Sequence, residues 1–510
     1  MDSAPSTSRT WSDRLLDRVE RAGNALPDPV TLFFLFIAIL MVASWLASAT
    51  GVSAVHPGTG EEIVVDNLFS SENIQRLFVE MPETFAAFPP LGLVLVVMLG
   101  IGVADKSGLI SAALSAFVRS VPDAALTAAL VFAGIMSSLA VDAGYVVVIP
   151  LGAVLFYGAG RHPLAGLAAA FAGVSAGFSA NLSLTSLDPL LAGFTQPAAQ
   201  LIDPSYTVDA TANYYLMIAL VPVFMAVGVW VTERIVEPRL GEYVPPEDLD
   251  TDASHDLSDE ERRGLRIAGI VFAVVAAGVV LLVAPENAPL RGTAGSLNPF
   301  YQSIVALMVV LFFLPGLAYG MTTGKITSDK DVAKMMSETM SDMGAYIVLA
   351  FAAAHFIAMF SWSNLGSVVA ITGASGLEAI GFTGIPLVVS FILVSGVINL
   401  FVGSASAKWA ILAPIFVPML MLLGYSPETT QAAYRIGDAF TNILTPLLPY
   451  FPLVIIFAER YDKDSGIGSI IALMLPYSIA FGIVSVIVLV LWIFFSLPLG
   501  PGVPLEYVTG

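Results

Sequence analysis

The sequence predicts an all-α polytopic membrane protein made of two halves, each with a hairpin and a broken helix. Of its 510 residues, 57% are hydrophobic and 12% are charged, whereas about 25% are charged in an average globular domain. Long apolar runs approach or exceed the ~20 residues that a helix needs to cross a bilayer. Polar residues and Gly/Pro breaks interrupt part of this apolar sequence, which is typical of helices that unwind around a polar ligand. The apolar runs include residues 30–50, 214–236, 264–283, 300–319, 347–362, 386–402 and 470–497.

An acidic segment at 237–262 divides the chain into two halves. It contains ten Asp or Glu residues between Glu237 and Glu261, and its last turn, Ser258 to Glu261, has the pattern of a capping box. Residues 1–27 lack the apolar core and small-residue cleavage site of a signal peptide, so we expect an amphipathic cytoplasmic lead-in before a first true transmembrane helix. The predicted organisation is a lead-in at 1–27, a first transmembrane half at 28–236, an acidic cytoplasmic loop at 237–262, a second transmembrane half at 263–500 and a tail at 501–510.

The charge distribution predicts the orientation and excludes several partners. The net charge of −19 argues against binding to nucleic acid, which requires basic patches. The absence of cysteine excludes thiolate catalysis and Cys-ligated metals, and no cofactor is expected. Lys and Arg are frequent in 1–29, 233–266 and 321–334, whereas 51–89 has one Arg and 493–510 has no base. Because basic loops stay in the cytoplasm, we expect a cytoplasmic N-terminus, with 51–89 and the C-terminus outside.

Each half contains the same succession of polar and broken sequence. A Ser-rich stretch is followed by an X-Pro pair at which a new helix is expected to begin. A polar stretch with Asn comes next, and then Thr and a Pro-Leu-Leu sequence at which the helix is expected to break. Interrupted segments at corresponding positions of two halves point to a transport site at the interface between repeats. We therefore expect a first hairpin at about 137–160 with a broken helix at about 165–195, and a second hairpin at about 403–424 with a broken helix at about 430–458.

A candidate cation site lies in these broken stretches. Arg435, Asp438 and Asn442 are spaced by three and four residues, which places them on one face of a helix. Carboxylate and amide oxygens suit Na⁺, a hard cation, and unwound backbone completes many such sites. The alternative is an Arg435–Asp438 ion pair with Asn amides that tie the broken helices together. The candidate ligands are Asn181, Asn399, Asp438 and Asn442.

The same region offers groups that recognise an aromatic acid. Arg435 presents a fork for a carboxylate, and Trp409 either contacts an aromatic ring or packs the hairpin. Ser404 and Ser406 at the hairpin tip are candidates to orient polar atoms, because helix N-terminal amides there favour an anion. Lys408 either takes part or extends to the membrane interface as a surface charge. Asp188 either belongs to the site or caps the helix ahead of Pro189.

Enzymatic readings find no support in the sequence. It contains no His-Glu-x-x-His zinc motif. Arg435 stands where an intramembrane aspartyl protease needs glycine two residues before Gly437-Asp438. Gly324-Lys325 lacks the remaining residues of a phosphate-binding loop. A channel stays an alternative, although no repeated carbonyl-filter motif is present. We therefore expect that the chain is not an enzyme and that an ion gradient, rather than ATP, drives transport.

The motifs resemble those of the AbgT family of p-aminobenzoyl-glutamate transporters. The resemblance is carried by 398–419 and 434–447 in the second half, and by 137–150 and 175–193 in the first half. It implies a homodimeric transporter of the ion-transporter superfamily in the bacterial inner membrane, with about nine transmembrane helices plus two re-entrant hairpins, arranged as two inverted repeats with broken helices. It also implies that the protein carries p-aminobenzoyl-glutamate or exports p-aminobenzoate-like antimetabolites, including sulfonamides. Family positions tied to transport correspond to Asp188, Ser406, Trp409, Pro427, Arg435, Asp438 and Pro446.

The expected function is transport of such aromatic acids, coupled to a cation gradient. Na⁺ is favoured over H⁺ because three Asn residues surround one well-placed carboxylate, although Asp438 or Asp188 offers a protonatable group. The resemblance implies both import and sulfonamide efflux, so the direction stays open. The alternative is a channel, or an importer of a different organic anion.

Overall fold

The computed structural model describes residues 29–55, 60–139, 144–245, 257–292 and 297–507, and almost all of its regular structure is helical. The predicted lead-in at 1–27, the middle of the acidic loop and the end of the tail fall outside these residues. Two short strands, β1 (Ser53–Val55) and β2 (Glu62–Val64), form an antiparallel hairpin. The helices of the first half are α2 (Pro29–Ala49), α3 (Ser71–Ala86), α4 (Pro89–Lys106), α5 (Leu109–Arg119), η1 (Asp123–Ala125), α6 (Leu126–Met136), η2 (Ser137–Leu139), η3 (Gly144–Val148), α7 (Ile149–Gly158), α8 (Pro163–Phe171), η4 (Ala172–Ala176), α9 (Leu187–Ala199), α10 (Tyr214–Val231), η5 (Thr232–Val236) and α11 (Glu237–Leu240). Those of the second half are α12 (Asp259–Leu281), α13 (Asn298–Gln302), α14 (Ile304–Thr322), α15 (Asp329–Asp342), α16 (Gly344–Trp362), α17 (Leu365–Ala379), α18 (Gly384–Asn399), α19 (Ala405–Leu422), α20 (Pro427–Thr441), α21 (Phe451–Glu459) and α22 (Ile467–Phe494).

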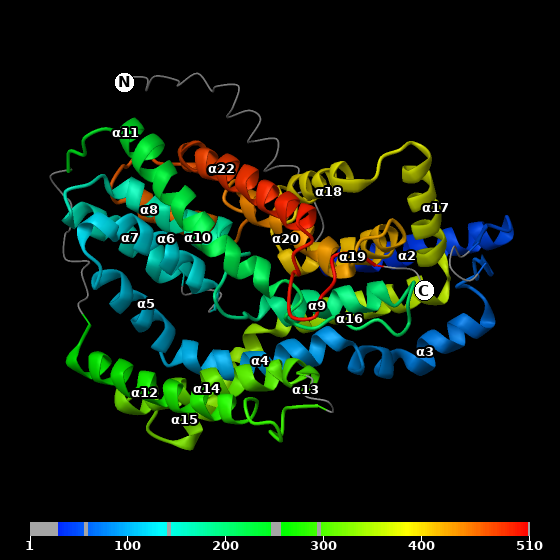
Figure 1. Ribbon diagram of the computed structural model, residues 1–510, viewed down its shortest axis with the longest axis horizontal. Helices are drawn as coiled ribbons and strands as arrows, with labels where there is room; N and C mark the ends of the chain where they lie inside the picture. Colours follow the sequence, from blue (N-terminus) through cyan, green and yellow to red (C-terminus); the bar gives the residue numbers. More distant parts are fainter. Residues whose placement is uncertain (1–28, 56–59, 140–143, 246–256, 293–296, 508–510) are drawn as a thin grey trace, which may run out of the picture.

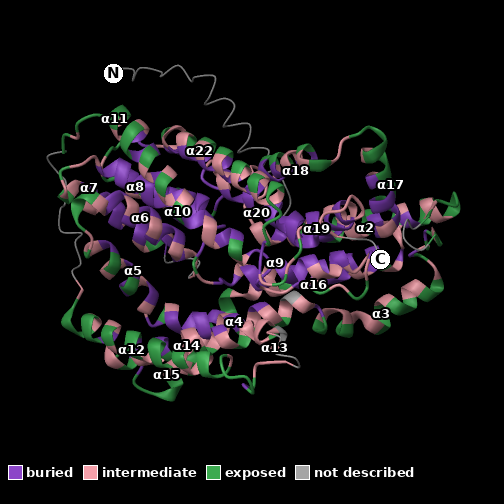
Figure 2. Cartoon of the chain, in the orientation of Figure 1, coloured by how far each residue is buried: buried purple, intermediate pink, exposed green. Residues whose placement is uncertain are grey.

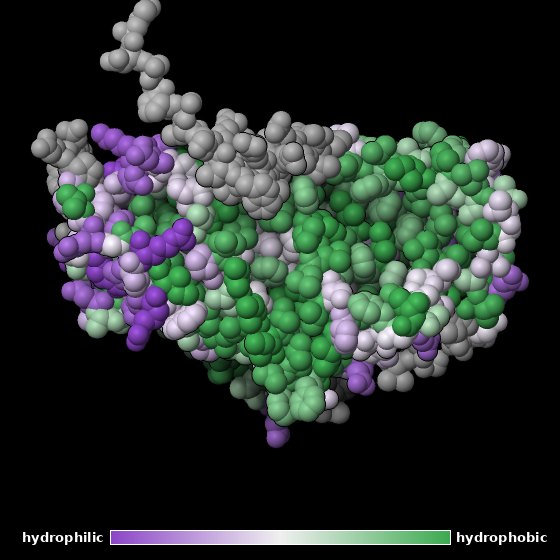
Figure 3. Space-filling view, turned by 90° about the horizontal axis from the view of Figure 1, so that it is seen from above, coloured by the Kyte–Doolittle hydropathy of each residue, from purple (hydrophilic) through white to green (hydrophobic). Residues whose placement is uncertain are grey.

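Many of these helices are long and apolar enough to cross a bilayer. Among the described residues there are eight such helical spans, or nine if the bent pair Leu109–Arg119 and Asp123–Leu139, which meet at 117°, counts as one span. Figure 3 shows a broad hydrophobic surface over the middle of the visible face, with hydrophilic residues gathered towards one end. The predicted all-helical polytopic membrane fold is confirmed.

The loops of the two predicted sides lie at opposite ends of the molecule. In Figure 1, α3 and the C-terminal segment lie at one end, and α11, where the acidic loop begins, lies at the other. The loop ends with the predicted cap: the Ser258 hydroxyl accepts from the Glu261 amide, and the Glu261 carboxylate accepts from the Ser258 amide. This satisfies amide groups at the start of α12 that otherwise lack a partner.

Both halves contain the same order of helices around a polar tip. In the first half, α6 and α7 flank the segment around 137–143, and α8, a break, α9 and α10 follow. In the second half, α18 and α19 flank residues 400–404, and α20, a break, α21 and α22 follow. The predicted hairpins, 137–160 and 403–424, therefore cover each tip and its second arm but miss the first arm. The first arms could not be predicted because each is an uninterrupted apolar helix, which gives no polar signal that would indicate a hairpin. Residues 140–143 of the first tip, Asp142 among them, lie outside the described residues.

Glycines bring the first arm of each hairpin against the following helix. A Cβ atom on Gly173 would lie 2.5 Å from the carbonyl oxygen of Val131 in α6. The corresponding position in the second half, Gly437 of α20, would meet the carbonyl oxygen of Ile392 in α18 at 2.4 Å. Small residues that let backbones approach closely are the usual means of joining helices inside a membrane. The two halves thus share a packing device as well as a helix order.

Both predicted broken helices are interrupted, but the first interruption lies before Leu187 and not at the predicted Pro-Leu-Leu position. No helix covers residues 177–186 before α9 or 442–450 between α20 and α21. In the second half, Thr445 and Pro446 lie inside the break, as predicted. In the first half, α9 begins at Leu187, so Pro189 lies in its first turn, where a missing N–H costs no hydrogen bond. Figure 2 shows buried residues concentrated along the central helices α8, α9, α19 and α20, and exposed residues on α3, α12 and α15.

Candidate functional site

A cavity of about 350 Å³ lies where the tips and the breaks of the two halves meet. The first half contributes the end of its first hairpin arm and its helix break, and the second half contributes its tip and its break. Helices α4 and α16 close the remaining side. The lining residues are Val94, Met98, Ser137, Ser138, Tyr145, Val174, Phe178, Thr185, Ser186, Leu187, Leu190, Met343, Tyr346, Gly403, Ala405, Ser406, Asn442, Leu448, Pro449 and Tyr450.

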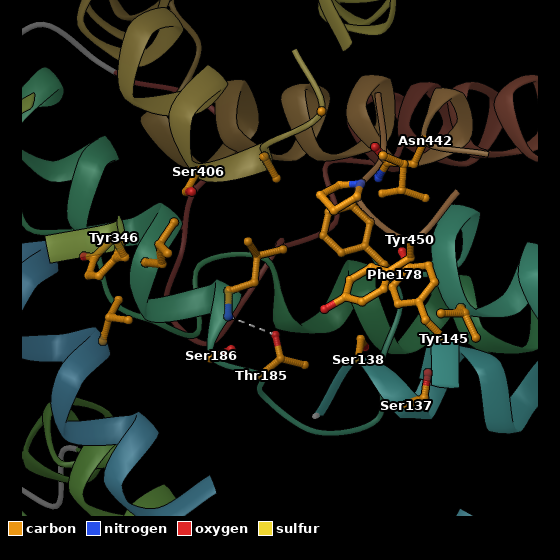
Figure 4. A pocket seen from close by; sticks show the side chains of 18 of the residues that line it. Ser137, Ser138, Tyr145, Phe178, Thr185, Ser186, Tyr346, Ser406, Asn442 and Tyr450 are labelled. Atoms are coloured by element: carbon orange, nitrogen blue, oxygen red, sulfur yellow. Dashed lines mark hydrogen bonds between the residues drawn. The ribbon is translucent and has the colours of Figure 1, made fainter. Parts of the chain in front are cut away.

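Four aromatic residues and five serine or threonine residues are among those that line this cavity. Figure 4 shows Tyr145, Phe178 and Tyr450 together on one side and Tyr346 on the other. The rings of Tyr145 and Tyr450 are stacked with centroids 4.3 Å apart, although one comes from each half. Sequence reasoning missed all four aromatic residues. A signal exists for Tyr145 and Tyr450, which directly follow the first tip and the second Pro-Leu-Leu-Pro break.

An ion pair joins the two halves beside the cavity. The Nη1 atom of Arg435 donates to Oδ1 of Asp188 at 2.5 Å. The other oxygen, Oδ2, accepts from the amide and the hydroxyl of Thr185 at 2.6 and 2.9 Å. Asp188 therefore takes part in the polar cluster, and from the first turn of α9 it bonds back to Thr185 rather than capping the helix. The Nε and Nη2 atoms of Arg435 are buried and have no hydrogen-bond partner among the described residues.

Trp409 is part of the interior rather than of the cavity wall. Its side chain is fully buried, and its indole stacks on Tyr434 with centroids 4.5 Å apart. Its Nε1 atom donates to Oγ1 of Thr195 in α9 at 2.9 Å. The predicted contact with a substrate ring is not available in this conformation. Trp409 instead fastens α19 of the second half to α9 of the first.

Lys408 forms a second buried ion pair, and it does so with Asp438. Its Nζ atom contacts Oδ1 of Asp438 and donates to Oδ1 of Asn399, and the side chains of Lys408 and Asp438 are both fully buried. Two interpretations are therefore wrong: Lys408 is not a surface charge at the membrane interface, and Arg435 does not pair with Asp438. Helical spacing put Arg435 and Asp438 on one face, but each is directed to a partner on another element.

The proposed cation ligands fall into two groups. The Nδ2 atom of Asn399 donates to the carbonyl oxygen of Asp438 and to Oδ1 of Asn442 at 2.7 and 2.8 Å. The Oδ1 atom of Asn442 thus faces the Nδ2–H group of Asn399. The Oδ1 atoms of Asn399 and Asp438 instead both contact the ammonium group of Lys408. Asn181 belongs to the other half, where its Nδ2 donates to Ser138 Oγ at 2.9 Å and its Oδ1 accepts from the Ser183 amide. The structure brings together three of the four candidates and separates Asn181 from them.

The remaining predicted residues lie at the second hairpin tip, at the start of α20 and in the second break. Ser404 caps α19, and its Oγ lies 3.2 Å from Oγ of Ser406, which lines the cavity. Pro427 is the first residue of α20 and follows the capping residue Ser426. Pro446 lies in the break that leads to Tyr450. These positions set the backbone path around the cavity.

Comparisons with known proteins agree on one family. A profile described as the AbgT putative transporter family matches residues 14–507, which confirms the resemblance found in the motifs. The p-aminobenzoyl-glutamate transport protein of Escherichia coli (strain K12) is 39% identical over 506 residues, which cover 99% of each chain. The solved YdaH transporter of Alcanivorax borkumensis superposes with a TM-score of 0.89 at 44% identity, covering 93% of this chain and 100% of that chain. MtrF of Neisseria gonorrhoeae, described among a class of antimetabolite efflux pumps, gives a TM-score of 0.91 at 45% identity over 96% of this chain and 100% of that chain.

Proposed function

The chain belongs to the AbgT putative transporter family, so it is a membrane transporter and not an enzyme, and on this premise we propose that it moves p-aminobenzoate-type aromatic acids by coupling to an ion gradient. The substrates in this proposal are p-aminobenzoyl-glutamate, p-aminobenzoate and, on the efflux route, sulfonamide antimetabolites. The observation that carries it is the cavity between the two halves, whose wall combines aromatic rings with hydroxyl and amide groups.

The chemistry of the cavity suits these substrates. An aniline ring fits between aromatic side chains, which favour offset-stacked or edge-to-face contacts. Tyr145, Phe178 and Tyr450 supply such surfaces on one side of the cavity. Ser137, Ser186 and Ser406 supply hydroxyl groups for an amine or an acid oxygen. A cavity of about 350 Å³ is near the lower end of ligand-pocket sizes, which suits a single-ring compound.

Arg435 is the proposed partner of the substrate acid. It lies directly behind the cavity residues Thr185, Ser186 and Leu187, because it is bonded to the next residue, Asp188. Two of its guanidinium nitrogens have no partner among the described residues. A carboxylate or sulfonyl group that reaches them would form charge-assisted bonds and compete with Asp188. Because Asp188 and Arg435 belong to different halves, this competition would also loosen the contact between the halves.

We propose Na⁺ as the coupling ion. A Na⁺ site is supported by the side-chain oxygens of Asn399 and Asp438, which both contact one positive group, the ammonium of Lys408. An amide oxygen and a carboxylate oxygen are suitable ligands for a hard cation, and residues 400–404 of the adjacent tip offer unwound backbone. A bound Na⁺ would balance the charge of Asp438 and link the tip of the second hairpin to α20.

The proposed setting is a homodimer in the bacterial inner membrane with a cytoplasmic N-terminus. The positions of α3 and the C-terminal segment at one end, and of α11 at the other, agree with this orientation. Light scattering of the purified protein would give its oligomeric state, and a monomeric mass would contradict this part of the proposal.

Efflux and import remain two candidate directions, each favoured by one relative. MtrF is described as an antimetabolite efflux pump, and the Escherichia coli relative as a p-aminobenzoyl-glutamate transport protein. Sulfonamide resistance of cells that express the protein would support efflux. Growth of a p-aminobenzoate auxotroph on p-aminobenzoyl-glutamate would support import.

Counterflow of labelled p-aminobenzoate in proteoliposomes tests the function directly. We expect transport in Na⁺ medium and loss of transport when K⁺ replaces Na⁺ at fixed pH. Unchanged transport in K⁺ would contradict Na⁺ coupling, and absence of counterflow for all three substrate types would contradict the substrate proposal. Protein-free liposomes provide the control.

A further inference from the structure

Lys408 occupies the point at which the proposed Na⁺ ligands converge. Its Nζ atom contacts Oδ1 of Asn399 and Oδ1 of Asp438, and both charged side chains are fully buried. The two proposed Na⁺ ligands therefore already bind a positive charge, and this charge is the ammonium group of Lys408. Neither the composition nor the spacing of the motifs indicated this arrangement, because Lys408 lies in α19 and Asp438 in α20.

We propose that Lys408 is a tethered cation that competes with Na⁺ for Asn399 and Asp438, so that Na⁺ binds only when the lysine side chain moves out. This inference rests on the proposed Na⁺ coupling and assigns a residue that regulates it. No covalent step is involved, since one cation replaces another at the same two oxygen atoms.

Charge balance requires exchange rather than simultaneous binding. Lys408 and Asp438 together are neutral, so an added Na⁺ would leave one positive charge without compensation in a buried place, which is strongly unfavourable. The other buried carboxylates among the described residues have partners elsewhere. Asp188 is bonded to Arg435, and Glu428 accepts from the hydroxyl of Tyr206 at the opposite end of α20. No second carboxylate is therefore available to balance both cations.

The displaced ammonium group has a polar space close by. Side chains of a helix lean towards its N-terminus. Gly403 of the tip and Ala405 and Ser406 of the first turn of α19 form part of the cavity wall. Asn442, which is hydrogen-bonded to Asn399, also lines the cavity. In this proposal the lysine head exchanges its buried partners for this cavity and its hydroxyl groups.

Binding of ²²Na⁺ to purified protein at fixed pH tests the competition. Lys408→Met removes the competing ammonium group, so Asn399 and Asp438 are always available to Na⁺. We expect Na⁺ to bind about 10-fold tighter or more than in wild type, where the state with the lysine moved out is a minor population. Lys408→Arg keeps the charge and should bind Na⁺ no better than wild type, and Asp438→Asn should abolish binding. Lys334→Met, at an exposed lysine of α15, is the matched control and should leave the affinity unchanged. Wild-type Na⁺ affinity in folded Lys408→Met would overturn the proposal.

A second measurement uses the wild-type protein and does not depend on how the variants fold. Amine-reactive labelling followed by mass spectrometry should modify Lys408 faster in Na⁺ than in choline, because Na⁺ drives the side chain towards the cavity. Lys334 should be labelled equally in both media. Equal labelling of Lys408 would show that Na⁺ does not displace it and would overturn the proposal.

The two experiments separate this inference from the proposed function. If wild type and Lys408→Met bind Na⁺ equally, the coupling ion stands and only the competition fails. If neither protein binds Na⁺ while transport continues, the proposed Na⁺ coupling fails, and the competition fails with it.

Discussion

At the scale of single residues, the chemistry depends on two buried ion pairs whose partners come from different elements. Arg435 is bonded to Asp188 of the other half, and Lys408 is bonded to Asp438 within the second half. Replacing buried ion pairs with apolar residues is often neutral or stabilising, so retention of two such pairs beside a cavity indicates a role in binding or switching. In the proposed mechanism the substrate acid would bind Arg435 and the coupling ion would bind Asp438.

Arg435→Lys separates recognition of the substrate acid from simple neutralisation of Asp188. A lysine ammonium can still balance Asp188, but it lacks the planar fork and the two free nitrogen donors. We expect affinity for p-aminobenzoate to fall by about 10-fold or more, as for loss of a charge-assisted hydrogen bond worth roughly 1.5–3 kcal/mol. Isothermal calorimetry on the purified protein measures this. Arg76→Lys, on exposed α3, should have no effect, and wild-type affinity in Arg435→Lys would mean that the arginine only balances charge.

Trp409→Phe tests whether this residue acts through packing. The variant keeps a ring against Tyr434 but loses the Nε1 donor to Thr195. We expect a loss of about 1 kcal/mol of stability, seen as a lower melting temperature, with p-aminobenzoate affinity changed less than 2-fold. A large loss of affinity at unchanged melting temperature would restore a direct contact between Trp409 and the substrate.

The residue types at the centre were predictable from the sequence, but their pairing was not. Charged and amide side chains in apolar segments are costly, which is why Arg435, Asp438 and Asn399 could be selected as functional candidates. The bond between Arg435 and Asp188 spans 247 positions, and local helical spacing pointed instead to Asp438. Of the aromatic residues in the cavity wall, Phe178 and Tyr346 could not be predicted, because in an apolar chain they do not differ from ordinary lipid-facing or core residues. Tyr145 and Tyr450 could have been selected from their places directly after the first tip and the second break.

At the scale of elements, helix breaks and close helix contacts place these residues. Pro446 marked the second break correctly, because proline cannot continue a helix without loss of a hydrogen bond. In the first half Pro189 lies in the first turn of α9, and the break precedes it. The first arms of the hairpins, α6 and α18, could not be recognised, since a short apolar helix looks the same whether it spans the membrane or turns back. What defines them in the structure is glycine-mediated contact of α6 with η4 and of α18 with α20, which no local pattern encodes.

Gly152→Ala should weaken the contact between the second arm of the first hairpin and the next helix. A Cβ atom at Gly152 in α7 would lie 2.6 Å from the carbonyl oxygen of Gly166 in α8, and a backbone atom cannot yield as a side chain does. We expect destabilisation of about 1–3 kcal/mol, the usual range for overpacking, measured by thermal unfolding in detergent. Gly158→Ala, at the open end of the same helix, is the matched control, because a Cβ atom there meets nothing within 4 Å. Equal melting temperatures for the two variants would contradict this account.

At the scale of the whole molecule, the C-terminal segment ties both halves together at one end. The carbonyl oxygen of Leu499 accepts from the amide of Tyr215 at the start of α10, in the first half. Leu505 accepts from the amide of Ser426, and Tyr507 donates to the carbonyl oxygen of Gly424, both just before α20 in the second half. The sequence predicted only a tail outside the membrane, because backbone contacts of an irregular segment leave no pattern in its side chains.

Truncation after Ser496 is expected to destabilise the protein while leaving its binding site intact. The truncation removes several backbone hydrogen bonds, each worth about 0.5–1.5 kcal/mol net, so a loss of a few kcal/mol and a clearly lower melting temperature should follow. No residue of 497–507 lines the cavity, so p-aminobenzoate affinity measured below the melting transition should stay within 2-fold of wild type. Truncation after Tyr507, which keeps all of these contacts, is the control. If the shorter protein melted like wild type but lost affinity, the segment would act on the transport site itself rather than hold the two halves together.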